Sequence, residues 1–249
     1  MRSDLYSTFN DLKSQLIIPS LKARRLTPEL MDDPNVDPEE LRKALRFIRR
    51  INRWLGYTKA TMSYIERFSV RWKPGELIHF VDFATGSADV PLAILEWADQ
   101  KGWNVRVTGI DFHERTAQEA IRSSSDPRLT IVCADALNPP FAPDSFDYAL
   151  TSLFLHHLPT NEATQVLANM ARVARRGIIA GDLLRNWRAY AGIKLLSSLA
   201  NPIVRHDAPA SVAAGFVREE VLAMRKAAGV EFARYRAHIA HRFVLAGEK

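Results

Sequence analysis

Short apolar runs alternate with helical segments from residue 74 onward, and this alternation limits the possible folds more than any other feature. Helical patterns at 87–101, 113–123 and 161–174 lie between most of these runs. Nearly continuous apolar strands joined by helices are typical of a parallel sheet covered on both faces. The sequence therefore predicts a doubly wound α/β fold. The five predicted strands are Leu77–Phe83, Val105–Ile110, Leu129–Cys133, Phe146–Ser152 and Gly177–Gly181.

The C-terminal part of the predicted sheet has a different connection. A helical region at about 186–199 is followed by a segment, 200–216, that we expect to be irregular, and then by a helix at 217–228. The last two strands, Val230–Ala237 and Arg242–Ala246, are separated by too few residues for a crossover helix. We therefore expect them to form an antiparallel hairpin beside an otherwise parallel sheet.

The N-terminal region carries the whole excess of positive charge. The chain has a net charge of +6, and residues 39–73 contain ten bases and three acids. Asp37 followed by Pro38 has the pattern of a helix start. Five apolar residues then recur at helical spacing, and the arginines lie mostly off that stripe. The stripe is Leu41, Leu45, Ile48, Ile51 and Leu55, and the arginines are Arg42, Arg46, Arg49, Arg50 and Arg53.

We expect this basic helix to break near Gly56 and a second helix to run from about Thr58 to Val70. The predicted organisation is an N-terminal helical cap or lid, residues 1–72, and a second domain, residues 73–249. The basic helix face is either a solvated surface or a platform for an anionic partner.

Composition excludes several classes of protein. The chain is 47% apolar and 25% charged, which is ordinary for a globular domain. A single cysteine, Cys133, excludes a disulfide framework and a multi-cysteine zinc site. The sequence contains no uncharged apolar run of the roughly 18 residues that a membrane span needs, and its first residues are polar. We expect a cytoplasmic protein, monomeric or homodimeric.

Three acids end three successive predicted strands: Asp82, Asp111 and Asp135. The carboxyl ends of parallel strands meet at one edge of a sheet, where ligands bind in open α/β folds. A row of carboxylates repels phosphates and favours a cationic nucleoside ligand. The turn after the first strand is rich in small residues but has only Gly86 as a glycine, so the dinucleotide fingerprint G-x-G-x-x-G is absent.

These residues carry a resemblance to a known family. Val81–Asp89 resembles motif I of class I S-adenosylmethionine-dependent methyltransferases, with Ala84 and Ala88 where glycines are usual. Asp111 matches the acidic residue of motif II. The resemblance implies a Rossmann-like sheet, S-adenosylmethionine as cofactor and S-adenosylhomocysteine as its product.

Two later segments are similar to the small-molecule branch of that family. Asp135 and Ala136 match the acid of the third strand and its small neighbour, and Phe141–Leu158 resembles the fourth-strand region of ubiquinone and menaquinone biosynthesis enzymes. The resemblance covers about 74–249. Asn138–Phe141 also spells the N-P-P-F motif of amide and adenine methyltransferases, but it precedes the fourth strand, so we interpret it as a turn.

The resemblance assigns the cofactor contacts by position. The loop after the first strand would hold the methionine part, Asp111 the ribose, Phe112 the adenine face, Asp135 the adenine amine, and Ser152 would pass near the sulfur. The implied cofactor residues are Asp82, Ala84, Thr85, Gly86, Ser87, Asp111, Phe112, Asp135, Ala136 and Ser152.

The acceptor side rests on histidines and on the segment after the fifth strand. A phenolic acceptor needs a general base at neutral pH, and histidine suits that role. We predict His157 as the pocket residue, with His156 and His206 as further candidates. Asp182 and Arg185, together with His206, are expected to bind the substrate. No metal site is predicted.

The predicted function is methyl transfer to a small molecule, with the oxygen of a phenolic or polyketide-like compound as the preferred acceptor. Three alternatives stay open at this point: a C-methyltransferase acting on a quinone-type ring, an RNA methyltransferase that uses the basic helix, and a non-enzymatic partner protein. The expected partner is thus a small-molecule acceptor, and nucleic acid is a less favoured partner.

Overall fold

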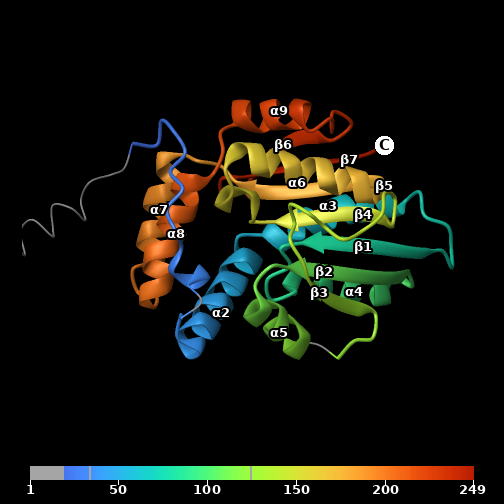
Figure 1. Cartoon of the computed structure of the whole chain (residues 1–249), viewed down its shortest axis with the longest axis horizontal. Coiled ribbons are helices and arrows are strands. Elements are labelled where there is room, and N and C mark those ends of the chain that lie inside the picture. The colour runs from blue at the N-terminus through green and yellow to red at the C-terminus, as the bar shows by residue number, and fades with distance from the viewer. Residues whose placement is uncertain (1–19, 34, 124) are drawn as a thin grey trace, which may run out of the picture.

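The fold is built on one seven-stranded sheet, whose strands lie one above another in Figure 1, from β6 at the top to β3 at the bottom. The computed structural model describes residues 20–33, 35–123 and 125–249. The strand order is β3-β2-β1-β4-β5-β7-β6. The first five strands are parallel, β7 is antiparallel to β5, and β6 is antiparallel to β7. The strands are β1 (Leu77–Phe83), β2 (Asn104–Asp111), β3 (Leu129–Cys133), β4 (Phe146–Ser152), β5 (Ala174–Leu183), β6 (Arg234–His238) and β7 (Arg242–Glu248).

The doubly wound, mostly parallel sheet with a C-terminal hairpin is confirmed. Helices cover both faces of it (Figure 1). The helices are α2 (Pro38–Trp54), α3 (Tyr57–Ser69), α4 (Asp89–Lys101), α5 (Glu114–Ser123), α6 (Thr160–Val173), α7 (Trp187–Ser197), α8 (Pro202–Ala214) and α9 (Arg218–Ala227), with short 3-10 turns η1 (Leu30–Asp32) and η2 (Leu155–His157).

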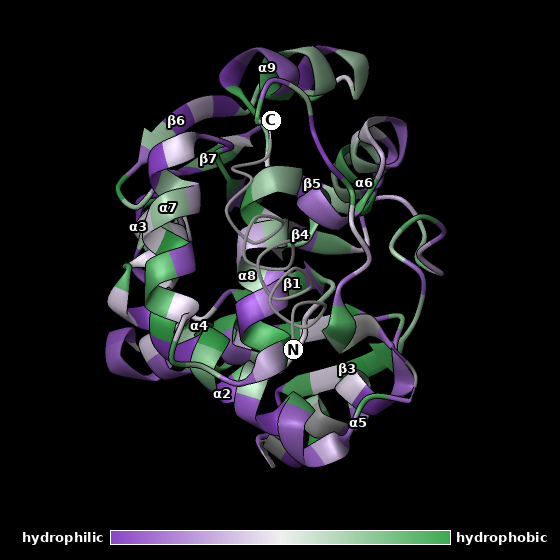
Figure 2. Ribbon diagram, turned by 90° about the vertical axis from the view of Figure 1, so that its left-hand side faces the viewer, coloured by the Kyte–Doolittle hydropathy of each residue, from purple (hydrophilic) through white to green (hydrophobic). Residues whose placement is uncertain are grey.

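Two buried clusters hold the layers together. On one face, Leu167 and Met170 of α6 and Met224 of α9 pack against strand side chains such as Phe83. On the other face, α3 and α4 supply the cover, and the fully buried Phe80 belongs to that cluster. Burying apolar surface of this kind contributes about 25 cal/mol per Å². Polar residues dominate the sequence of α5, at the β3 edge of the sheet, and colour it hydrophilic in Figure 2.

The N-terminal basic segment folds as predicted. The Asp37 carboxylate accepts hydrogen bonds from the backbone N–H groups of Glu39 and Glu40, and Pro38 occupies the first turn of α2. Gly56 lies between α2 and α3 with a φ of 73°, a conformation in which a residue with a side chain is strained. Tyr64 of α3 belongs to the core cluster under the sheet, so α3 is part of the sheet's cover. The domain boundary at residue 72 stays a prediction.

The segment 200–216, which we expected to be irregular, is largely helical. Asn201 caps α8 by accepting a hydrogen bond from the Val204 N–H, and Pro202 stands in the first turn. Pro209 lies inside the helix. Proline disfavours helix interiors because it lacks an N–H and its ring meets the preceding turn. Here packing outweighs that cost, because Ile203 and Val204 are buried against Ala44 of α2.

The first strand of the C-terminal hairpin begins later than the predicted Val230. Residues 230–233 form a turn, in which the Ala233 N–H donates to the Val230 carbonyl, and β6 begins only at Arg234. Among the residues that the structure describes, every helix is too short or too polar to cross a bilayer. Helices α2, α7 and α8 gather at one end of the sheet (Figure 1), where they form the walls of the site described next.

Candidate functional site

A cavity of 940 Å³ lies between the ends of β1, β2 and β4 and the helices α2, α7 and α8. One wall of it is the apolar stripe of α2 that the sequence shows at helical spacing. These side chains are only partly buried, because they face the cavity and not the sheet. The stripe residues in the lining are Leu41, Leu45, Ile48, Ile51 and Leu55.

The three acids at the strand ends line this one cavity. Asp82 is 2% exposed, and its Oδ2 accepts a hydrogen bond from Thr85 Oγ1 at 2.9 Å. Its Oδ1 has no hydrogen-bond partner among the described residues. Burial raises the pKa of Asp82 to about 8, with the nearby acids Asp89 and Asp111 raising it further against the opposing effect of the Thr85 hydrogen bond. A cation in the cavity would favour the ionised form of this carboxyl.

The other two acids are fixed by hydrogen bonds from loops at the ends of the strands. Asp111 accepts hydrogen bonds from the backbone N–H groups of Gly86 and His113, each at 3.0 Å. Asp135 accepts one from the Leu137 N–H at 2.8 Å and another from an Asn138 side chain. Asp135 is thus held at the cavity by its own turn, and Asp111 both by its own turn and by the neighbouring loop after β1.

The loop between β1 and α4 bends through left-handed backbone conformations. Ala84, Gly86 and Ala88 have φ values of 54°, 56° and 58°. Two alanines therefore stand where the backbone favours glycine, which costs about 1 kcal/mol or more for each. A Cβ on Gly86 would meet no atom within 4 Å, so space for a ligand lies above the loop.

A glycine in β2 lets this loop pack closely on the sheet. A Cβ on Gly109 would lie 2.7 Å from Thr85 Oγ1, so any side chain there would displace the residue that bonds to Asp82. The structure brings all the predicted cofactor residues to the same cavity, and their roles as contacts stay predictions. They are Asp82, Ala84, Thr85, Gly86, Ser87, Asp111, Phe112, Asp135, Ala136 and Ser152.

Two histidines and a glutamate gather elsewhere on the cavity lining. His156 and His157 lie in η2, directly after β4, with ring centroids 4.3 Å apart. His156 Nε2 is 4.0 Å from one carboxylate oxygen of Glu29, and His157 Nδ1 is 3.8 Å from the other. The Glu29 and His156 side chains are 7% and 4% exposed, and that of His157 is 25% exposed.

Asp182 has a different place from the one we predicted. It is fully buried and lies behind His156, outside the cavity lining. Its Oδ1 is 2.6 Å from His156 Nδ1, and its Oδ2 accepts from the His156 backbone N–H at 3.0 Å. Burial favours the neutral acid, but the His156 ring and backbone N–H groups outweigh it and lower the pKa of Asp182. Asp182 therefore orients His156, which lines the cavity, and does not itself line it.

Arg185 and His206 also lie outside the cavity lining. Arg185 is 4% exposed, and its guanidinium pairs with Glu220 of α9 at 2.9 Å, so its place is in the packing of α9. The His206 ring is 42% exposed and lies 2.7 Å from the carboxylate of Asp207. The predicted substrate contacts at these positions are thus not supported. His156 and His157 are the candidate bases that the structure places at the cavity.

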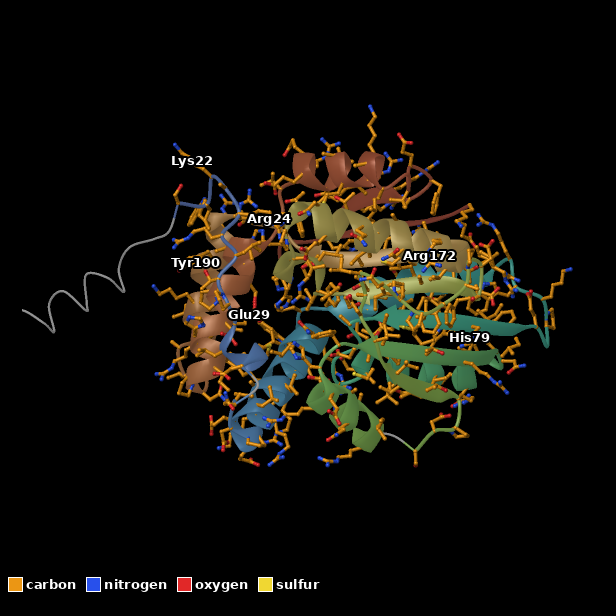
Figure 3. The ribbon with its side chains drawn as sticks, in the orientation of Figure 1. Lys22, Arg24, Glu29, His79, Arg172 and Tyr190 are labelled. Carbon is orange, nitrogen blue, oxygen red and sulfur yellow. The ribbon has the colours of Figure 1, made fainter. Side chains whose placement is uncertain are left out.

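Glu29 is the site residue that the sequence analysis missed. Asp207 of α8 accepts hydrogen bonds from the backbone N–H groups of Leu30 and Met31, at 2.8 and 3.0 Å, and so fixes the turn that follows Glu29. Ser211 Oγ donates to a Glu29 carboxylate oxygen at 2.5 Å. Figure 3 shows Glu29 beside the helices at the end of the sheet. No local pattern around position 29 indicates this contact.

Three of the five arginines of α2 have separate contacts. Arg42 and Arg46 both pair with Glu39, at 2.7 and 3.7 Å. Arg49 lines the cavity and donates to the Ser87 carbonyl at 3.3 Å. This division does not support an RNA-binding stripe.

Comparison with known proteins supports the resemblance. Residues 80–177 match the family described as a methyltransferase domain. The demethylmenaquinone methyltransferase of Staphylococcus epidermidis is 33% identical over 98 residues, which are 39% of this chain and 39% of that protein. The chain thus spans well under half the length of this curated relative.

Solved structures show the same fold at low identity. The plantazolicin methyltransferase BpumL, solved in complex with SAH, aligns with a TM-score of 0.63 and 14% identity, over 85% of this chain and 91% of that one. A SAM-dependent methyltransferase from Aquifex aeolicus aligns with a TM-score of 0.54 and 16% identity, over 76% and 88%. The predicted methyltransferase fold is confirmed, and residues 80–177 match the methyltransferase domain family.

Proposed function

We propose that this chain, whose residues 80–177 match the methyltransferase domain family, transfers a methyl group from S-adenosylmethionine to an apolar small molecule. One observation carries the proposal: the acids that end three neighbouring strands line the same cavity as the apolar face of α2. The first set suits a cationic nucleoside, and the second suits an acceptor with a large apolar surface.

The residues at the strand ends fit this cofactor. Asp82 is a buried carboxyl with an unpartnered oxygen, and a neighbouring cation would favour its ionised form against the cost of burial. The open space above Gly86 gives a ligand access to the backbone of the loop. When bound, S-adenosylmethionine supplies an electrophilic methyl group on a positively charged sulfur.

Each carboxylate has a distinct task under this proposal. Asp111 ends the second strand of the sheet, where an acid can accept both ribose hydroxyls. Asp135 accepts from the adenine amine, and the loop from Asp82 to Ser87 holds the methionine part. Positioning of donor and acceptor then supplies much of the rate acceleration, because a well-aligned pair avoids the entropic cost of encounter.

The acceptor lies against α2 and approaches η2. Stripe residues such as Leu45 and Ile48 of α2 offer it an apolar wall. His156 and His157 reach the same space and provide the groups that a hydroxyl acceptor needs to lose its proton. A phenolic or polyketide-like oxygen is therefore our preferred acceptor. Enclosure by α2, α7 and α8 also keeps water away from the reacting groups.

A carbon acceptor on a quinone-type ring is the second candidate. The apolar wall suits such a ring equally well, and the relative from Staphylococcus epidermidis is named a demethylmenaquinone methyltransferase. An RNA acceptor is less favoured, because Arg42 and Arg46 pair with Glu39 and Arg49 faces the cavity.

Calorimetry with S-adenosylhomocysteine tests the cofactor assignment. We expect binding to the wild-type chain and at least a tenfold weaker affinity in Asp111→Ala. The control is Asp144→Asn, which removes an exposed carboxylate from a turn outside the cavity and keeps a side chain that tolerates the left-handed backbone there. An affinity that stays the same in Asp111→Ala would contradict the proposal.

A second assay identifies the acceptor. Phenols, quinone precursors and tRNA are offered with a labelled methyl donor, and the methylated atom is located by mass spectrometry. Transfer to a phenol oxygen supports the preferred acceptor, and transfer to a quinone ring carbon supports the second candidate. Transfer to tRNA alone would refute both.

A further inference from the structure

We propose that Glu29, His156 and His157 bind a divalent transition-metal ion on the acceptor side of the cavity. The proposal concerns a site separate from the carboxylates that would hold the cofactor. Metal binding itself does not depend on the proposed function, whereas the role that we give the ion rests on it. Two imidazoles and one carboxylate are a ligand set typical of zinc or ferrous iron.

The distances among the three side chains suit a shared ion better than direct bonds. The candidate ligand atoms all lie within 4.8 Å of one another. The two His–Glu separations, 4.0 and 3.8 Å, are too long for hydrogen bonds. Zinc takes nitrogen and oxygen ligands at about 2.0–2.2 Å, so two ligands on one tetrahedral ion lie roughly 3.4 Å apart. Small side-chain rotations would bring these atoms to that spacing.

Asp182 supplies the support that a metal-binding histidine usually has. Metal-bound histidines commonly donate their second ring N–H to a carboxylate, which fixes the ring and its tautomer. Asp182 Oδ1 lies 2.6 Å from His156 Nδ1. With that nitrogen protonated, Nε2 carries the lone pair, and Nε2 is the atom that faces Glu29. The fully buried Asp182 thus presents His156 as a ligand.

Glu29 is also held in place by neighbouring residues. Asp207 binds the backbone N–H groups of Leu30 and Met31, and Ser211 donates to the Glu29 carboxylate. The segment that carries Glu29 runs beside the helices at this end of the sheet, with Arg24 farther along it (Figure 3). These contacts already order the Glu29 segment in the free protein. Ion binding would therefore cost little further conformational entropy.

The ion would have an open coordination position toward the cavity. Catalytic zinc sites keep three protein ligands and leave the fourth position for water or substrate. All three proposed ligands lie in the cavity lining, beside the place where we put the acceptor. An acceptor hydroxyl bound there would ionise more readily, and its proton would pass to water. The metal would thereby replace His157 as the means of activating the acceptor.

The test measures zinc binding by the full chain. Protein freed of metal with a chelator is titrated with Zn²⁺ alone by calorimetry, and Co²⁺ is used as a spectroscopic probe of the ligand geometry. We expect one Zn²⁺ per chain. We expect Glu29→Gln and His157→Ala each to weaken the affinity at least tenfold, and Asp182→Asn to weaken it about 10- to 100-fold.

The control is His113→Ala, which removes an exposed histidine from the lining of the same cavity. We expect its zinc affinity to match that of the wild type. Titration of each variant with S-adenosylhomocysteine shows whether the chain is still folded. Two results would refute the metal site and leave the proposed function standing. In the first, the full chain binds S-adenosylhomocysteine but takes up no stoichiometric Zn²⁺. In the second, Glu29→Gln and His157→Ala bind Zn²⁺ as tightly as the wild type does. Zinc binding without any cofactor binding would support the metal site and refute the proposed function instead.

Discussion

Replacing Asp82 by asparagine tests the electrostatic basis of the cofactor site. In the ligand-free protein, burial raises the pKa of this carboxyl from 3.8 to about 8. Each tenfold change in an acid constant corresponds to about 1.4 kcal/mol. Ionising Asp82 in the folded chain therefore costs about 6 kcal/mol more than ionising it in the unfolded chain. The side chain introduced by Asp82→Asn cannot ionise, and its amide oxygen can still accept the hydrogen bond from Thr85.

The sign of the pH dependence follows from where the proton binds. Between pH 4 and 8 the folded chain keeps the Asp82 proton and the unfolded chain releases it, so this residue makes the wild type less stable as pH rises. Asp82→Asn removes that contribution. We expect the free energy of unfolding of Asp82→Asn, relative to wild type, to grow by about 3 to 4 kcal/mol between pH 5 and pH 8.

Urea unfolding of both proteins at several pH values, without cofactor, measures this difference. The buried amide adds a cost of its own, but that cost does not vary with pH, so the slope is the diagnostic quantity. Thr85→Val is the matched variant. It removes a hydrogen bond that lowers the pKa of Asp82, so the loss of stability should extend to higher pH. A stability difference that is flat from pH 5 to 8 would refute the reasoning.

Three further predictions follow from particular backbone and packing positions. Ala84→Gly relieves a residue with a φ of 54° and should leave stability equal or about 1 kcal/mol higher, whereas Ala93→Gly inside α4 should cost about 1 kcal/mol; urea unfolding compares them. Gly109→Ala should cost about 1–3 kcal/mol and weaken S-adenosylhomocysteine binding, because its Cβ would press on the loop above; unchanged calorimetry would count against this. Arg185→Met should reduce the free energy of unfolding without changing the KM for the acceptor, because the Arg185 guanidinium pairs with Glu220 and lies outside the cavity lining. A higher KM at unchanged stability would instead support Arg185 as a substrate contact.

The local sequence was sufficient to predict the sheet and one half of the site. Apolar runs and turn residues depend on neighbours in the chain, so the parallel strands and the hairpin were predictable. Because parallel strands end at one edge, the positions of Asp82, Asp111 and Asp135 in the sequence already placed them together. The spacing of the apolar residues in α2 also identified its apolar face, but not that this face lines the cavity.

Contacts between distant segments decided the rest. Glu29 lies 4.0 Å from His156 because contacts of Asp207, Ser211 and Arg24 hold its segment against α8 and η2, and no pattern near position 29 encodes that docking. Arg185, in the loop after β5, pairs with Glu220 of α9 and so lies outside the cavity lining. The sequence by itself determined the elements and the row of acids, since periodicity and strand ends are local properties. Only the tertiary structure decided which polar side chains line the cavity, because that depends on the partners that packing brings to each of them.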